Sequence, residues 1–119
     1  MPIMTITTLS GKKAEDKEKL AKELTEEIHA LMNLPKEVIR VIFQEIPAGS
    51  YAVGGEMLSP NAKEPAERDD TILQIRFLFG HSKSEKKEII NHLADVLKKN
   101  PPFSSASIRV IIEIGRAHV

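Results

Sequence analysis

The residue of this chain with the clearest chemistry is Pro2, which directly follows Met1. Removal of Met1 turns the proline nitrogen into a secondary amine. An unperturbed α-amino group titrates at about 7.7–8.0, and burial or nearby cations lower its pKa toward neutrality. Such an amine is a suitable general base for moving a proton next to a carbonyl group. The alternative is an incidental second residue, or an inert amide nitrogen if Met1 is retained.

Two arginines within apolar, β-branched runs are the next candidates. In a strand, Val38 and Ile42 would lie on the same face as Arg40, one on each side of it. Arg109 follows Arg40 by 69 positions. A charged residue in such a run is either a substrate ligand or one half of a buried ion pair. Guanidinium groups bind planar carboxylates through two parallel hydrogen bonds. Arg109 either serves the Pro2 of a neighbouring chain or pairs with a carboxylate.

The elements around these residues form a repeat. The pattern predicts a strand over 2–9, an amphipathic helix over 14–32 and a strand over 38–46. The same order returns as a strand over 71–79, a helix that Ser82 caps and Pro101-Pro102 ends, and a strand over 107–114. A constant offset of 69 relates Leu24 to Leu93 and Ile28 to Leu97 without a gap. We therefore predict two consecutive β-α-β repeats, with repeat one at 2–56, an exposed linker at 57–70 and repeat two at 71–119.

The fold class that follows is α+β, in a single domain. Paired edge to edge, the two repeats give a four-stranded mixed sheet with both helices on one face. The other face is also largely apolar, and nothing in the chain is left to cover it. A bare face of this kind predicts an oligomer, and three such units can close into a homotrimer.

Composition excludes several function classes. Lys+Arg and Asp+Glu are balanced at 17 each, which argues against nucleic acid or an anionic membrane as partner. There is no cysteine, and the histidines show no metal-ligand spacing, so we expect no metal and no cofactor. No run of apolar residues is long enough for a membrane span, and no signal peptide is evident. The expected location is the cytoplasm.

The stretch from Pro2 to Leu58 contains a distinctive set of residues, namely Pro2-Ile3, Gly11, Lys17, Pro35, Arg40-Val41-Ile42, Glu45, Tyr51 and Gly54-Gly55-Glu56. In these residues it resembles the tautomerase superfamily, and specifically 4-oxalocrotonate tautomerase. The second half resembles a diverged copy, as in the double-length, fused members.

The resemblance implies that Pro2 is the general base and that Lys12 and Arg40 bind the carboxylate and carbonyl oxygens of the substrate. It also implies that Tyr51 forms an apolar wall of the pocket. Lys12 stands where close relatives have arginine. It keeps the positive charge but lacks the planar guanidinium group that binds a carboxylate through two hydrogen bonds. The alternative is that Lys12 is a solvated lysine of the loop with no role in binding. Tyr51 replaces the usual phenylalanine, with simple hairpin packing as the alternative. Thr71 stands where a second Pro2 would be, so the second repeat has no base of its own.

The implied activity is a cofactor-independent tautomerase (isomerase) acting on small keto or enol acids, namely 2-hydroxydienoates or enol-pyruvates. One rival is a hydrolase, because residues 43–49 and 70–72 also resemble cis-3-chloroacrylic acid dehalogenase. Phe79-Gly80-His81 counts against that rival, which has arginines around this loop. The other rival is a non-catalytic trimeric module in which Pro2 never becomes a free amine.

Overall fold

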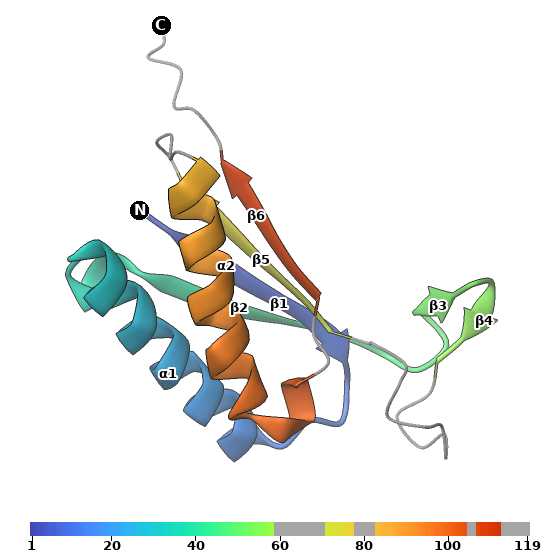
Figure 1. The fold of residues 1–119 in the computed structure, drawn as a ribbon. Coiled ribbons are helices and arrows are strands. Elements are labelled where there is room, and N and C mark those ends of the chain that lie inside the picture. Colours follow the sequence, from blue (N-terminus) through green and yellow to red (C-terminus); the bar gives the residue numbers. More distant parts are fainter. Residues whose placement is uncertain (59–70, 78–82, 105–106, 113–119) are drawn as a thin grey trace, which may run out of the picture.

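Two β-α-β units share one four-stranded sheet in the structure, a computed structural model that describes residues 1–58, 71–77, 83–104 and 107–112. Figure 1 shows both helices on the same side of that sheet and a small hairpin standing away from it. The elements, in chain order, are β1 (Ile3–Leu9), α1 (Ala14–Met32), the 3-10 helix η1 (Lys36–Val38), β2 (Arg40–Ile46), β3 (Ala52–Val53), β4 (Glu56–Met57), β5 (Ile72–Phe77), α2 (Lys83–Lys98), the 3-10 helix η2 (Pro101–Phe103) and β6 (Ser107–Ile112).

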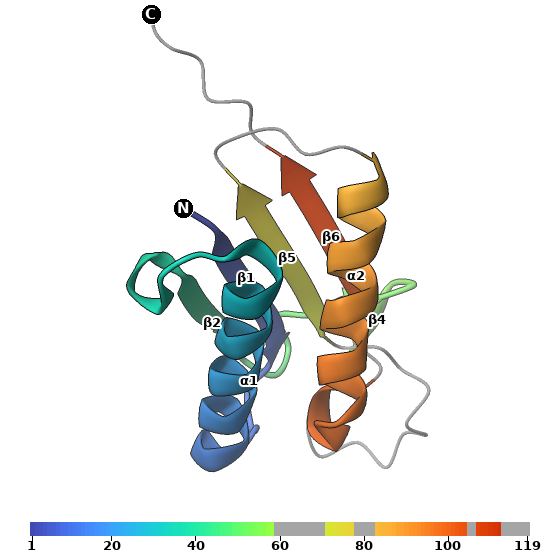
Figure 2. The same ribbon diagram turned by 60° about the vertical axis from the view of Figure 1, so that its left-hand side comes forward.

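The sheet has the strand order β2-β1-β5-β6. Within each repeat the two strands are parallel, and the repeats meet through the antiparallel pair β1–β5. Figure 2 shows α1 and α2 side by side across the same face. These features confirm the predicted α+β fold, with a mixed sheet and both helices on one face.

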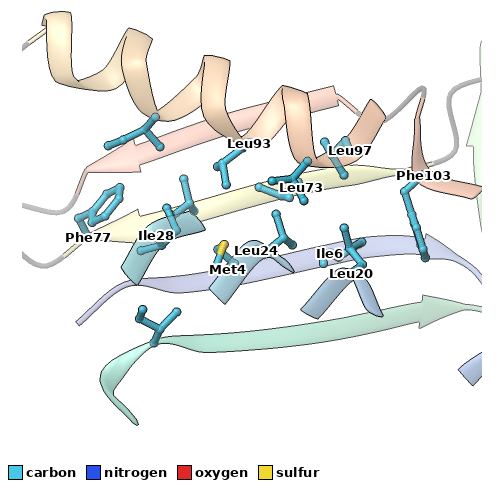
Figure 3. Packing of buried hydrophobic residues seen from close by; sticks show 14 residues of the cluster. Met4, Ile6, Leu20, Leu24, Ile28, Leu73, Phe77, Leu93, Leu97 and Phe103 are labelled. Carbon is cyan, nitrogen blue, oxygen red and sulfur yellow. The ribbon is translucent and has the colours of Figure 1, made fainter. Parts of the chain in front are cut away.

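The core lies between the sheet and the two helices. Strand residues that alternate toward the helices, such as Met4, Ile6 and Leu73, are fully buried there. The helical stripe around Leu24 and Leu93 packs onto them, as Figure 3 shows. Full burial of each such aliphatic side chain contributes roughly 1.5–3 kcal/mol. The apolar periodicity therefore identified the face that each helix buries.

The start of β2 differs from the prediction. We expected a strand from Val38, but the chain forms η1 there, and β2 begins at Arg40. The amide of Val38 donates to the carbonyl oxygen of Pro35 at 3.2 Å, and that of Ile39 donates to Lys36 at 3.1 Å. Proline fixes its φ near −65°, which suits the residue that opens such a turn. Val38 is β-prone, but these turn hydrogen bonds determine its conformation.

The constant offset of 69 also fails in the last strand. Ile3 pairs with Arg40 in the first repeat, whereas Ile72, 69 positions after Ile3, pairs with Ser107. Ser107 follows Arg40 by only 67 positions. The structural counterpart of Arg40 is therefore Ser107, and Arg109 lies two residues further along the sheet, where it pairs with Gln74. The predicted equivalence of Arg40 and Arg109 is wrong.

The shift arises where α2 ends. α1 continues to Met32, whereas α2 ends at Lys98, 66 positions later. Asn100 closes α2, because its amide donates to Leu97 at 3.0 Å and its side-chain nitrogen donates to Val96 at 2.8 Å. Two prolines follow and cannot continue the helix. The second repeat thus leaves its helix earlier than the first and enters its last strand in a different register.

The hairpin β3–β4 ends the first repeat. Ala52 pairs with Met57, and the amide of Leu58 donates to Tyr51 at 2.7 Å. Met57 and Leu58, which we had assigned to the linker, therefore belong to the hairpin and its base. The remaining linker residues, 59–70, lie outside the described residues, as do 78–82 with the loop at Gly80 and the chain beyond 112.

Candidate active site

Pro2 lies immediately before β1, at one end of the sheet, and it is buried. Its carbonyl oxygen accepts a hydrogen bond from the amide of Arg40 at 3.1 Å. This bond is the first of the parallel ladder between β1 and β2. Backbone pairing between the parallel strands β1 and β2 therefore holds Pro2, the candidate base, next to Arg40, the first candidate cation.

Arg40 is exposed, and its side chain turns back toward the end of the sheet. Its Nη1 donates to the carbonyl oxygen of Glu37, three residues earlier in η1. η1 is itself tied to α1 by an ion pair between Lys36 and Glu26. The hydrogen bond from Lys36 lowers the pKa of the Glu26 carboxyl below its ordinary value. Because that pair is exposed, it positions the turn before Arg40 with little net stabilisation.

The sheet face opposite the helices presents three rows of cross-strand neighbours. Thr7 Oγ1 donates to Gln44 Oε1 at 3.2 Å across this face, and Ile42 is 47% exposed on it. By register, the rows on β2, β1 and β5 are Arg40, Ile3 and Arg76; Ile42, Thr5 and Gln74; and Gln44, Thr7 and Ile72. We call these positions the open face.

The charges of the open face are of one sign. On β2, β1 and β5, arginine occupies two of the nine positions, Arg40 and Arg76, and none of these nine positions is aspartate or glutamate. The acid of β2, Glu45, belongs to the opposite face, where Lys17 of α1 binds it at 3.0 Å. The row that begins with Arg40 lies at the Pro2 end of the open face.

Lys12 and Tyr51 lie at the other end of the sheet. β1 runs away from Pro2 over seven residues to Leu9 before Lys12 is reached. At about 3.3 Å per residue, this strand alone spans roughly 20 Å. At that far end Ser10 donates to Ile46 at 2.8 Å, and Tyr51 follows the end of β2. Within one chain, Pro2 and Arg40 therefore lie at one end of the sheet and Lys12 and Tyr51 at the other, so these two pairs cannot meet.

The second repeat begins at the far end as well. Thr71, the counterpart of Pro2, is buried, and its hydroxyl oxygen lies 2.9 Å from that of Thr8. Two of the histidines also have structural partners: His29 Nδ1 lies 2.5 Å from the carbonyl oxygen of Leu34, and His92 Nδ1 lies 2.5 Å from Glu27 Oε1. In the described part of the chain, no group of three or more His, Cys, Asp or Glu residues is arranged to hold a metal.

Sequence reasoning missed Arg76 as a neighbour of Pro2. The offset of 69 equates Arg76 with Thr7, which lies at the far end of β1. In the structure Arg76 pairs with Ile3, directly after Pro2, because β5 runs antiparallel to β1. The placement of Arg76 follows from the direction of β5 relative to β1, and the position of Arg76 within the repeat does not predict it.

The part of the chain that carries Pro2 and Arg40 matches a known family of proteins. A family model described as "Tautomerase enzyme" matches residues 2–61, and the chain belongs to this tautomerase family. A probable tautomerase of Streptococcus pyogenes serotype M3 is 40% identical over 57 residues, which are 48% of this chain and 93% of that relative. A probable tautomerase of Ralstonia nicotianae is 40% identical over 65 residues, 55% of this chain and 91% of the relative.

The solved structures that resemble the chain extend over both repeats. Native fused 4-OT has a TM-score of 0.74 at 19% identity and is matched over 92% of this chain and 85% of its own. A fused 4-OT described as an asymmetric trimer has a TM-score of 0.73 at 20% identity, over 94% and 85%. The family model thus lies over the first repeat, the two probable tautomerases match about half of this chain, and the fused 4-OT structures share the fold of nearly the whole chain.

The structure also bears on membrane association. Over the residues that it describes, neither helix combines the length and the apolar character needed to cross a bilayer.

Proposed function

We propose that this protein is a cofactor-independent tautomerase in which Pro2, once Met1 has been removed, is the general base. Its substrates are small 2-hydroxydienoate or enol-pyruvate acids. The observation that supports this proposal most directly is the pairing of Pro2 with Arg40, through a 3.1 Å backbone hydrogen bond, in a chain of the tautomerase family.

The proposed reaction is an isomerisation in which atoms and protons balance. The Pro2 nitrogen takes the proton of the 2-hydroxyl group, and the electron pair shifts through the conjugated system to a carbon atom. The resulting ammonium then returns the proton to that carbon, which leaves a 2-keto acid and a free amine. Arg40 and a further cation stabilise the carboxylate and the oxygen on which negative charge develops.

We further propose that Lys12 and Tyr51 act on the Pro2 of a neighbouring subunit in a homotrimer. The roughly 20 Å length of β1 argues against their acting on the Pro2 of their own chain. The open face supports assembly, because Ile42 on it is 47% exposed. Similar structures of fused 4-OT are described as trimers, both symmetric and asymmetric.

The test begins with the amino terminus. Intact mass spectrometry of the purified protein is expected to show the loss of one methionine. A cleavable amino-terminal fusion should be inactive until cleavage leaves Pro2 as the first residue. Activity is followed as ketonisation of phenylenolpyruvate by ultraviolet absorbance, with release of chloride from a 3-chloroacrylate as the readout of the hydrolase alternative.

The decisive variant is Pro2→Ala, with Pro102→Ala as the matched control because Pro102 is an exposed proline in η2. Pro2→Ala replaces the secondary amine with a primary amine that no ring holds in place, so kcat/KM should fall by up to the factor of about 10²–10⁴ that general-base catalysis typically contributes, and Pro102→Ala should lose little. A Pro2→Ala protein that ketonises the substrate at the parental rate contradicts the proposal. Chloride release with little ketonisation supports the hydrolase instead.

A further inference from the structure

The first two residues of the chain have different surroundings. Met1 is 43% exposed, whereas Pro2 is buried. The carbonyl oxygen of Pro2 accepts the 3.1 Å hydrogen bond from the amide of Arg40. Ile3, the next residue, has a strand partner on each side, in β2 and in β5, and Figure 1 shows β1 between these two strands. The Met1–Pro2 peptide bond therefore lies directly before a central strand that is paired on both sides.

This pairing limits access to the Met1–Pro2 bond. A methionine aminopeptidase cuts the first peptide bond of a chain end, and it has to bind Met1 together with the residues that follow. Whether such a segment can be cut depends on its burial and its hydrogen bonds, and a folded substrate is cut in proportion to the population of its open form. Strands paired on both sides belong to the part of a fold that opens least often. The bond is thus inaccessible in the folded chain, although Met1 itself reaches solvent.

The order of the strands along the chain leaves time for the cut before folding. β1 is synthesised first, whereas its partners β2 and β5 end only at Ile46 and Phe77. At about 5–20 residues per second, synthesis as far as Phe77 takes roughly 4–15 s. During that time β1 lacks at least one of its two neighbours. The second repeat, which supplies β5, completes the enclosure of β1.

We infer that Met1 is removed only while β1 is still unpaired, so that folding closes the Pro2 site to further maturation. The step is a hydrolysis: water adds across the Met1–Pro2 bond, the carbonyl carbon of Met1 takes the hydroxyl group, and the Pro2 nitrogen takes the hydrogen. Free methionine leaves. A chain that folds with Met1 attached has the same sheet, because β1 begins only at Ile3, but its Pro2 nitrogen remains an amide. That such a chain is inactive rests on the proposed function; the order of cutting and folding does not.

The time at which the peptidase is added tests this order. The full chain is synthesised in a translation system reconstituted from purified components, with a deformylase present throughout. A methionine aminopeptidase is added either at the start or after synthesis has ended, and intact mass spectrometry follows the loss of one methionine. The matched control carries Met-Pro-Ile and about eight Gly and Ser residues ahead of an intact β1, which places the same bond in a flexible tail. A synthetic peptide of residues 1–9 gives the rate for this bond without any fold.

Enzyme present from the start should remove Met1 from nearly all chains. Enzyme added after synthesis should act at least tenfold more slowly on the native chain than on the tailed control or the peptide, because the open form of a paired strand is rare. Late removal at the rate of the control and the peptide overturns the inference, and so does a chain that keeps Met1 when the enzyme is present from the start. Because mass alone reports these results, they are independent of the ketonisation assay, in which a fully active Pro2→Ala protein contradicts only the proposed function.

Discussion

Two inactive variants should restore each other's activity when they share one oligomer. Pro2→Ala replaces the secondary amine of the proposed base with a primary amine that no ring holds in place, and Lys12→Ala removes a cation that lies beyond Leu9, at the opposite end of β1. The strand alone spans roughly 20 Å, so the Lys12 side chain cannot reach the Pro2 of its own chain. If each site joins Pro2 of one subunit to Lys12 of the next, a mixed oligomer contains intact sites.

The size of the recovery follows from the composition of the mixed trimers. A trimer that contains both variants has one neighbouring pair, of its three, that joins an intact Pro2 to an intact Lys12, so about a third of all sites are complete. Ketonisation of phenylenolpyruvate should therefore rise from the low rate of either parent to about a third of the wild-type rate. The two variants are co-expressed with different tags and purified through both, and each parent alone is carried through the same steps.

The refuting result is specific. If native mass spectrometry shows that both variants are present in the same oligomers, and the rate is still no higher than that of the parents, then Lys12 does not complete a neighbour's site. The proposal that Lys12 and Tyr51 act across subunits then fails, while the role of Pro2 is untouched.

Three further outcomes are expected. The kcat/KM for phenylenolpyruvate should fall about tenfold per pH unit below the pKa of the Pro2 ammonium, since only the free amine accepts a proton; a flat acidic limb of the pH profile contradicts a titrating base. Phe103→Ala should destabilise the fold by about 3–5 kcal/mol in urea unfolding, because Phe103 is fully buried with its ring centroid 6.3 Å from that of Phe43. The free energies of unfolding of Thr8→Val, Thr71→Val and the double variant should give a coupling energy of about 1 kcal/mol, because the two hydroxyl oxygens lie 2.9 Å apart. Additive effects of the two substitutions contradict this pairing.

The helices and the buried stripes could be predicted because apolar periodicity reports directly which side of an element is buried. The helix over Ala14–Met32 and the buried pair Leu24 and Leu93 follow from such spacing. The register of β6 could not be predicted in this way. It depends on where α2 ends, which is decided by the hydrogen bonds of Asn100 and the two prolines after it. A gapless repeat in the sequence therefore does not imply a gapless repeat in space.

The candidate site shows the same limit. Pro2 and Arg40 could be placed together because parallel strands of a β-α-β unit begin at the same end of the sheet. The separation of Lys12 from Pro2 follows from the length of β1, but a family resemblance lists both residues without saying which chain supplies each. Arg76 was hidden because repeat position and spatial position differ whenever two repeats pair antiparallel.

That antiparallel pairing makes the two ends of the sheet chemically different. Had both repeats begun with a free proline, a base would stand at each end. Here one end has Pro2 with Arg40 and Arg76 beside it, and the other has Thr71, buried against Thr8. A residue inside the chain cannot become an amine, so fusion of the repeats limits each chain to one base. The second repeat is then free to vary, and the end of its strand β5, with Arg76, lies next to the start of β1.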